Sequence, residues 1–153
     1  DFHVAIIREI GRPVDPQAID DALCSFLLDL PQYKLDMLLD LRRQGYRVFM
    51  LSNTNPIMMR FMMEHRFKQQ GLTIDAYFDR LFLSYRMKLV KPYPEIYRKM
   101  IDESGILPAE SLFIDDSEAN IRTAASLGFN TYLAAQHEDF RNLFSQYEPF
   151  TEK

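Results

Sequence analysis

Two adjacent carboxylates follow a short apolar run near the end of the sequence. The run 112–114 reads as a buried strand, and Asp115 and Asp116 come directly after it. Two acids at a strand end repel each other unless a cation lies beside them. Carboxylate oxygens suit Mg²⁺, which often shares its coordination shell with a phosphate. The alternative is structural: Asp116 or Ser117 caps the following helix, which accounts for one acid but poorly for the pair.

Polar groups also follow the two preceding apolar runs. The run 46–51 leads into Ser52 and Asn53, and the run 81–84 leads through a short segment to Lys91. If these runs are parallel strands, the polar groups gather at one edge of the sheet, where ligands bind. Hydroxyls, backbone N–H groups and an ammonium cradle a phosphate while acids hold a metal ion. Taken singly, Ser52 and Asn53 are better explained as helix caps and Lys91 as a solvated lysine, but three such strand ends favour a site.

The elements that must position these groups follow from the spacing of apolar residues, proline and glycine. Short apolar runs alternate with helical patterns, which predicts an α/β fold: a Rossmann-like parallel sheet with helices on both faces. We expect strands at 46–51, 81–84, 112–114 and 130–133, and helices at 2–10, 15–30, 33–43, 58–67, 94–104, 119–127 and 137–147. The methionines at 58, 59, 62 and 63 are expected to pack in the apolar interior rather than to bind a metal.

The overall composition restricts the classes of protein. The 153 residues fit one domain, 47% of them are hydrophobic, and the net charge is −4 with no basic stripe. We therefore expect no nucleic-acid partner, and no apolar run reaches the length of a membrane span. Cys24 is the one cysteine, so a packing role and a reducing, cytoplasmic location are expected. His3, His65 and His137 lack metal-ligand spacing and are expected at the surface or at helix ends.

The order of these motifs resembles that of haloacid dehalogenase-like (HAD-like) hydrolases. The second motif of that superfamily corresponds to 51–55, the third to Lys91-Pro92 with 95–97, and the fourth to 113–117 with Asn120. The resemblance implies a HAD-like α/β core, with the helices before residue 46 forming part of a small helical cap. The second motif is most similar to capped members that act on sugar phosphates, such as glucose-1-phosphate phosphatase.

The resemblance implies a Mg²⁺-dependent phosphomonoester hydrolase that acts on a small phosphorylated metabolite. Ser52 would donate its hydroxyl to a phosphoryl oxygen, helped by the backbone N–H of Asn53. Lys91 would steady both the nucleophile and the charge that develops on the phosphoryl group.

The same resemblance implies how the metal ion is held. Asp116 falls at the family's main metal-binding aspartate, and Asp115 would assist directly or through a water molecule. Asn120 stands where many relatives carry another acid, so we expect it to support the site.

One part of the family pattern has no counterpart in the printed residues. The family's nucleophile lies in an Asp-x-Asp motif after an apolar strand, whereas the aspartates between residues 15 and 40 fall in helix caps or helical patterns. We expect the chain to be the C-terminal piece of a longer enzyme, with 1–44 as the remnant of a helical cap and connecting helix and 45–153 as a core that lacks its first strand. The full-length enzyme would act through an aspartyl-phosphate, and the piece alone would be inactive and leave two strand edges unpaired.

Other functions share parts of this pattern. A haloacid dehalogenase has the same fold without metal, but the acid pair counts against it. A phosphoreceiver domain carries its acid pair after the first strand, whereas here the pair comes last. A third alternative is a non-catalytic binding or scaffold protein that lost its nucleophile, and only the upstream sequence separates it from a truncated enzyme. Substrate identity, phosphatase against phosphomutase, and oligomeric state stay open.

Overall fold

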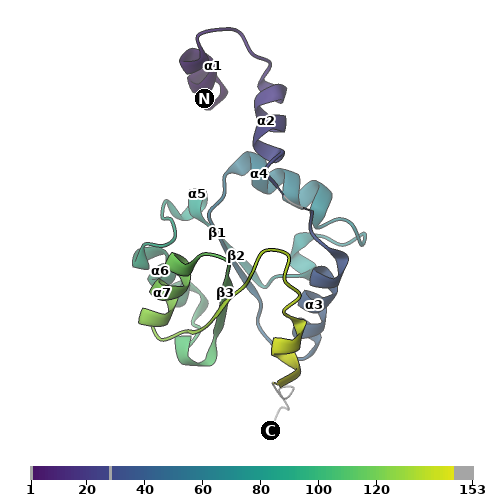
Figure 1. The fold of residues 1–153 in the computed structure, drawn as a ribbon, viewed down its shortest axis with the longest axis vertical. Coiled ribbons are helices and arrows are strands. Elements are labelled where there is room, and N and C mark those ends of the chain that lie inside the picture. Colours follow the sequence, from purple (N-terminus) through teal and green to yellow (C-terminus); the bar gives the residue numbers. More distant parts are fainter. Residues whose placement is uncertain (1, 28, 147–153) are drawn as a thin grey trace.

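The computed structural model describes residues 2–27 and 29–146 (Figure 1). The strands are β1 (Phe49–Ser52), β2 (Arg80–Leu83), β3 (Leu112–Asp115) and β4 (Asn130–Leu133). The α-helices are α1 (Phe2–Ile10), α2 (Pro16–Cys24), α3 (Gln32–Arg43), α4 (Pro56–Phe61), α5 (Ser84–Met87), α6 (Pro94–Ser104) and α7 (Glu118–Ser126). Other helical turns are a π-helix η1 (Met62–Arg66) and the 3₁₀ turns η2 (Ile74–Ala76), η3 (Pro108–Glu110) and η4 (Arg141–Gln146). Helical connections between successive strands allow the parallel pairing that the sequence predicts.

The strands pair in parallel, β1 with β2 and β3 with β4, so they form two two-stranded sheets rather than one continuous sheet. The registers align the carboxyl ends within each pair: Ser52 lies opposite Leu83, and Asp115 lies opposite Leu133. Among the described residues, β1 and β3 each have a strand partner on one side only. The polar residues that follow β1, β2 and β3 therefore leave their strands at carboxyl ends, as expected.

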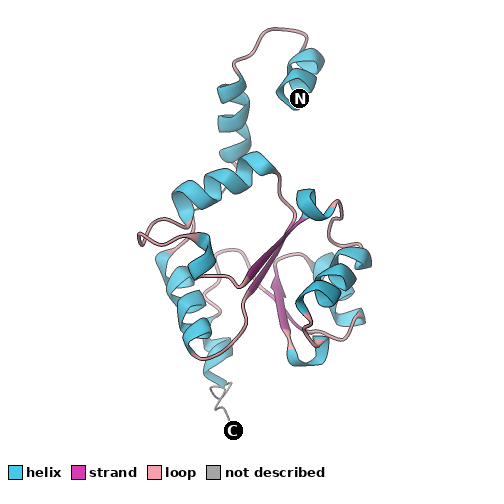
Figure 2. Ribbon diagram, turned by 180° about the vertical axis from the view of Figure 1, so that it is seen from behind, coloured by secondary structure: helices cyan, strands magenta, loops and turns pink. Residues whose placement is uncertain are grey.

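Alternate strand residues enter two apolar clusters, one on each face of the strands. Phe82 belongs to one cluster with Tyr97 of α6 and Phe113 of β3. Leu83, its neighbour in β2, belongs to the other cluster with Leu35 of α3. Figures 1 and 2 show α6 and α7 on one flank of the strands and α3 on the other. The predicted α/β layering, with helices on both faces, is confirmed.

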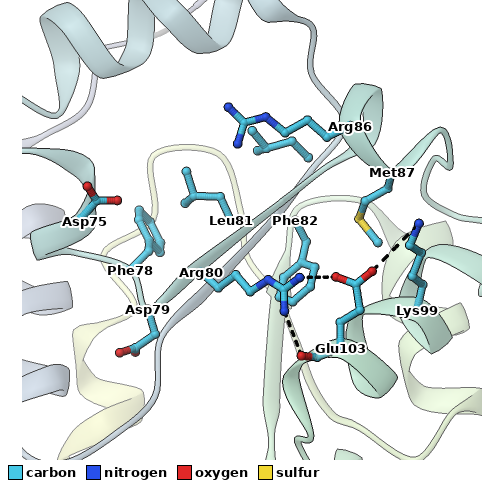
Figure 3. A pocket seen from close by; sticks show the side chains of 11 residues that line it. Asp75, Phe78, Asp79, Arg80, Leu81, Phe82, Arg86, Met87, Lys99 and Glu103 are labelled. Carbon is cyan, nitrogen blue, oxygen red and sulfur yellow. Dashed lines mark hydrogen bonds and ion pairs between the residues drawn. The ribbon is translucent and has the colours of Figure 1, made fainter.

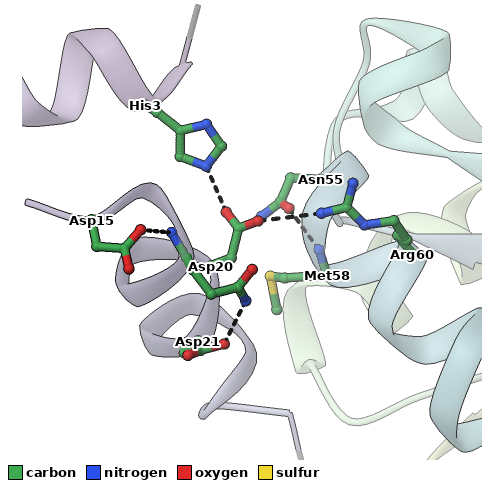
Figure 4. Close-up of polar contacts among 8 residues, drawn as sticks. His3, Asp15, Asp20, Asp21, Asn55, Met58 and Arg60 are labelled. Atoms are coloured by element: carbon green, nitrogen blue, oxygen red, sulfur yellow. Dashed lines mark hydrogen bonds and ion pairs between the residues drawn. The ribbon is translucent and has the colours of Figure 1, made fainter.

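Helices α1 and α2 extend away from the α/β layers (Figure 1). No residue of α1 is fully buried, and a polar contact joins it to α2. Asp20 of α2 is only 8% exposed, and its carboxylate lies 2.6 Å from His3 Nε2 of α1 and 3.2 Å from an Arg60 guanidinium nitrogen of α4 (Figure 4). One buried carboxylate thus joins three helices, and His3 lies at a helix end, one of the two places expected for it, where it contacts that carboxylate.

Helix α2 is shorter than predicted. The expected helix reaches residue 30, but α2 ends at Cys24. Ser25 donates its hydroxyl to the Ala22 carbonyl over 2.7 Å, and the backbone N–H of Leu27 turns back to the Cys24 carbonyl over 3.0 Å. A serine hydroxyl that bonds a nearby carbonyl competes with helix continuation. The prediction for residues 25–27 and 29–30 is therefore wrong, and residue 28 lies outside the described residues.

The predicted terminal helix over 137–147 is also wrong where the structure describes it. His137 has a φ of 63°, in the left-handed region that ends regular helices. Glu138 accepts a hydrogen bond from the Ala135 N–H at 2.7 Å and from the Tyr132 hydroxyl, so it anchors a turn instead of a helix. Only the 3₁₀ turn η4 follows, and residue 147 lies outside the described residues.

The remaining predicted elements lie at or near their expected places. The helices over 2–10 and 94–104 and the strand over 130–133 have the predicted bounds. The strand expected at 46–51 begins at Phe49, because Val48 exchanges hydrogen bonds with Asp79 instead. Asn55 accepts a hydrogen bond from the Met58 N–H at 2.9 Å and starts α4, and Met59 is buried as expected. None of the helices in the described ranges is long and apolar enough to span a membrane.

Candidate active site

Asp115, the last residue of β3, lies at the centre of a polar cluster. Its Oδ2 accepts a hydrogen bond from Lys91 Nζ at 2.6 Å. Its Oδ1 accepts one from Asn120 Nδ2 at 2.8 Å and one from the Ser117 backbone N–H at 2.9 Å. The Lys91 and Asp115 side chains are only 11% and 6% exposed. The structure therefore brings three of the predicted site residues, Lys91, Asp115 and Asn120, into direct contact.

The surroundings of Asp115 favour its ionised form. Burial acts to raise the pKa of this carboxyl, but the hydrogen bonds from Lys91 and Asn120, the Lys91 charge and the Ser117 N–H together outweigh burial. The net effect is that the pKa of Asp115 lies below its ordinary value. Asp115 is thus a carboxylate whose two oxygens already have hydrogen-bond donors.

The surroundings of the Asp116 side chain differ from those of Asp115. Asp116 is exposed, and within the described ranges no hydrogen bond or ion pair reaches its carboxylate. Helix α7 begins after Ser117 without a side-chain capping bond, so the capping explanation for the acid pair is not what the structure shows. An accessible carboxylate without a protein partner is the donor that a hydrated Mg²⁺ ion needs.

The donor set fits a Mg²⁺ ion that relies on water and substrate oxygens. No cluster of three or more His, Cys, Asp or Glu side chains occurs in the part of the chain that the structure describes. Mg²⁺ keeps several waters and usually takes one or two carboxylates together with a phosphate. Asp116 would serve as the direct ligand, and Asp115, which is held by Lys91, would act beside it.

Ser52 ends β1, and Asn53, the next residue, contacts the segment that carries Lys91. The Asn53 side chain bonds the Lys91 backbone twice, at 2.9 Å each. The Ser52 hydroxyl, by contrast, has no hydrogen bond to any described residue, which leaves it available to a ligand. The predicted contribution of these two residues to phosphate binding stays a prediction.

A serine that the sequence analysis placed in a strand belongs to this region. Ser84 begins α5 and is 6% exposed. Its hydroxyl accepts a hydrogen bond from the Thr54 N–H and donates one to the Thr54 carbonyl, both at 3.0 Å. The signal in the sequence that could have identified Ser84 is the change from an apolar run over 81–83 to a polar residue. Ser84 ties the end of β1 to the end of β2.

Tyr97 contacts the polar cluster through the backbone of Asn120. Its side chain is fully buried, and its hydroxyl donates to the Asn120 carbonyl over 3.2 Å. Burial, and to a lesser extent the Asp115 charge, raises the pKa of Tyr97 well above the usual tyrosine value. The tyrosine therefore stays a neutral donor that links α6 to the first turns of α7.

Two surface hollows lie away from this cluster. One, of about 470 Å³, lies along β2 and is lined by Arg80, Arg86 and Glu103 among others (Figure 3). There Arg80 is ion-paired with Glu103, whose carboxylate also lies 4.0 Å from Lys99 Nζ. The other, of about 500 Å³, lies between α4 and α5. Neither includes a predicted site residue.

Comparison with known proteins agrees with the fold. The family profile described as haloacid dehalogenase-like hydrolase matches residues 11–128. The chain therefore belongs to the haloacid dehalogenase-like hydrolases, as its motifs predicted.

Individual relatives refine this assignment. The chain is 37% identical over 131 residues to D-ribitol-5-phosphate phosphatase of Bacteroides thetaiotaomicron, a match that covers 86% of this chain and 63% of that protein. It is 29% identical to (S)-2-haloacid dehalogenase 4A of Burkholderia cepacia over 76% of this chain and 49% of that protein. The chain thus spans less than two thirds of these curated relatives.

Solved structures give the same picture. A HAD family enzyme from Bacteroides thetaiotaomicron, in complex with magnesium and inorganic phosphate, superposes with a TM-score of 0.90 at 43% identity and covers 94% of this chain and 72% of that chain. A HAD-like hydrolase from Porphyromonas gingivalis superposes with a TM-score of 0.88 at 39% identity, over 95% and 70% of the two chains. Magnesium is thus present in at least one close structural relative.

Proposed function

We propose that the protein containing this chain is a Mg²⁺-dependent phosphomonoester hydrolase for a small phosphorylated metabolite, such as a sugar or sugar-alcohol phosphate. The observation that carries the proposal is the contact of Lys91 and Asp115 between two separate strand pairs, with Asp116 exposed beside them. The similarity to a D-ribitol-5-phosphate phosphatase supports the substrate class.

Each residue has a distinct task in this proposal. The Ser52 hydroxyl and the Asn53 backbone N–H donate to phosphoryl oxygens, and the Lys91 ammonium offsets the negative charge that increases there during transfer. Asp116 would hold the metal ion, which supplies further charge neutralisation when bound. Asp115 holds the Lys91 ammonium in place, and Asn120 orients Asp115.

The attacking group is assigned to an Asp-x-Asp strand that none of the printed residues supplies. Its carboxylate oxygen would form a bond to phosphorus while the bond to the substrate oxygen breaks and the alcohol leaves with a proton. Water would then cleave the aspartyl-phosphate, which releases phosphate and restores the carboxylate. In the same proposal, 1–44 is the remnant of a cap with its connecting helix, and 45–153 is the core without its first strand.

The test measures phosphate release from a panel of phosphate monoesters by the whole protein, with Mg²⁺ and with EDTA. We expect Mg²⁺-dependent release that Asp116→Asn lowers at least about a hundredfold, since metal ligation supplies several kcal/mol. Asp102→Asn, at an exposed acid on α6, is the matched control and should retain activity. Equal activity in the Asp116 and Asp102 variants would overturn the metal assignment.

A dehalogenase is the alternative with a named relative. It would release halide from a 2-haloacid without a metal ion. The carboxylate of Asp116, which has no partner among the described residues, has no task in that reaction, and this favours the phosphatase. Halide release from 2-chloropropionate that persists in EDTA, without phosphatase activity, would reverse this preference.

A further inference from the structure

The Asn53 side chain holds both backbone polar groups of Lys91. The Lys91 N–H donates to Asn53 Oδ1 at 2.9 Å, and Asn53 Nδ2 donates to the Lys91 carbonyl at 2.9 Å. Among the described residues, these are the hydrogen bonds of the Lys91 backbone. We infer that Asn53 is a positioning residue, which acts through its side chain to fix the Lys91 ammonium against Asp115. The role of Lys91 itself rests on the proposed function.

The inference depends on where Lys91 lies. It follows α5 in a segment whose neighbours Val90 and Pro92 are exposed, and it lies outside regular secondary structure. Its side chain is nevertheless only 11% exposed, and its ammonium lies 2.6 Å from Asp115 Oδ2. A lysine side chain loses much rotational freedom when it is held in one place. Because the Lys91 backbone is fixed at both its N–H and its carbonyl, less conformational freedom is left to be lost when the Lys91 ammonium is held against Asp115.

The residue after Asn53 is held by a second pair of hydrogen bonds. The buried hydroxyl of Ser84 bonds both the N–H and the carbonyl of Thr54, the residue that follows Asn53. Ser84 thus fixes the backbone just after β1, and Asn53 in this segment bonds the backbone of Lys91. Lys91 then reaches Asp115 in the other pair of strands. The contacts thus lead from Ser84, at the start of α5, to the residues that follow β1, and from these residues to the Lys91 backbone. The Lys91 ammonium then contacts Asp115 at the end of β3.

This task differs from the one that the motif resemblance assigns. There, Asn53 acts through its backbone N–H, which any residue type except proline provides. Both contacts to Lys91 use the side chain, and they need an acceptor and a donor on the same planar group. An amide side chain satisfies both requirements, whereas alanine satisfies neither.

The test follows the Lys91 amine in the ligand-free chain, so it does not depend on catalysis. Site-resolved acetylation by mass spectrometry gives the rate at Lys91 relative to the exposed Lys99 in the same molecules. We expect Asn53→Ala to raise this relative rate about tenfold, the factor that follows from losing one to two hydrogen bonds. Asn55→Ala is the matched control, since Asn55 caps α4 two residues further on. It should lower thermal stability and leave the Lys91 rate unchanged.

Two further measurements keep the inference open to refutation if Asn53→Ala does not fold. In the unaltered chain, the Lys91 amide hydrogen should exchange at least about tenfold more slowly than a free loop amide, because it is bonded to Asn53. Ser84→Ala should raise the Lys91 acetylation rate in the same direction but less than Asn53→Ala. An unprotected Lys91 amide overturns the inference, and so does an Asn53→Ala variant that loses stability like Asn55→Ala while the Lys91 rate stays unchanged. Absence of phosphatase activity would leave this result standing and would refute only the proposed function.

Discussion

The Lys91 ammonium lies 2.6 Å from Asp115 Oδ2 although the two residues belong to different strand pairs. Lys91 follows β2 by eight residues, and Asp115 ends β3. Their contact is a direct polar connection between the halves of the α/β layer.

Asp115→Asn should lower the free energy of unfolding by about 3 kcal/mol, because it leaves the shielded Lys91 ammonium without its counter-charge. Urea denaturation followed by circular dichroism measures the change. The neighbouring substitution Asp116→Asn removes an exposed carboxylate without a partner among the described residues and should stay within about 0.5 kcal/mol of the unaltered chain. Equal losses in both variants would contradict the difference between the two acids.

The stability of the chain should fall in acid partly through Asp115. Its pKa in the folded state lies below the ordinary value of 3.8, so at low pH the unfolded chain binds its proton first. The contribution of Asp115 is therefore complete above the unfolded value and is lost as the pH falls through the folded value. Urea midpoints measured from about pH 6 down to about pH 3 should drop less steeply in Asp115→Asn than in the unaltered chain. Identical slopes would show that the carboxyl is not perturbed.

Tyr97→Phe should cost about 1 kcal/mol of unfolding free energy, since it removes the donor to the Asn120 carbonyl inside a fully buried region. The ring stays, so its packing against Phe113 is retained. Tyr93→Phe provides the control, because Tyr93 is 63% exposed and lies just before the same helix. A loss that is no larger than the control's would mean that the hydroxyl does not support α7.

Asp20→Asn should release α1 from the rest of the chain. The substitution removes the charge that holds His3 and Arg60, the contacts that join α1 and α4 to α2. Hydrogen exchange of the α1 amides should become at least about fivefold faster, while exchange in α6 stays unchanged. Asp21→Asn is the control, since Asp21 is exposed and its side chain accepts a bond from Gln17 of its own helix. Slow exchange of α1 in Asp20→Asn would show that apolar contacts hold that helix.

Much of the architecture was predictable because local signals and burial agree. The helix over 94–104 has proline in its first turn and Gly105 just after its end, in the left-handed conformation that glycine favours. The residues of β2 alternate between the two apolar clusters, so a short apolar run was sufficient to identify the strand. Membership of the haloacid dehalogenase-like hydrolases followed from three motifs in the correct order.

The errors come from side chains that compete with the backbone. Ser25 ends α2 early, and Glu138 with His137 replaces the terminal helix by turns, although the apolar spacing of both segments is helical. Such competition depends on tertiary position, which periodicity does not report. Within the site, residue types predicted that Lys91 and the acids meet. The sequence did not predict that Lys91 pairs with Asp115 or that Asn53 bonds the Lys91 backbone twice, because a sequence does not specify which oxygen meets which donor.

The arrangement along β2 also bears on solubility. Among the residues that the structure describes, this strand pairs with β1 alone, and an unpaired strand edge is a template for intermolecular aggregation. Its first residue, Arg80, carries a charge that is ion-paired with Glu103, and its last residues are covered as the chain turns into α5. A short strand that begins with a charged pair is a poor seed for fibril-like stacking. We expect Arg80→Val to self-associate faster than the unaltered chain, as measured by light scattering. Unchanged scattering would show that Arg80 does not protect the strand edge.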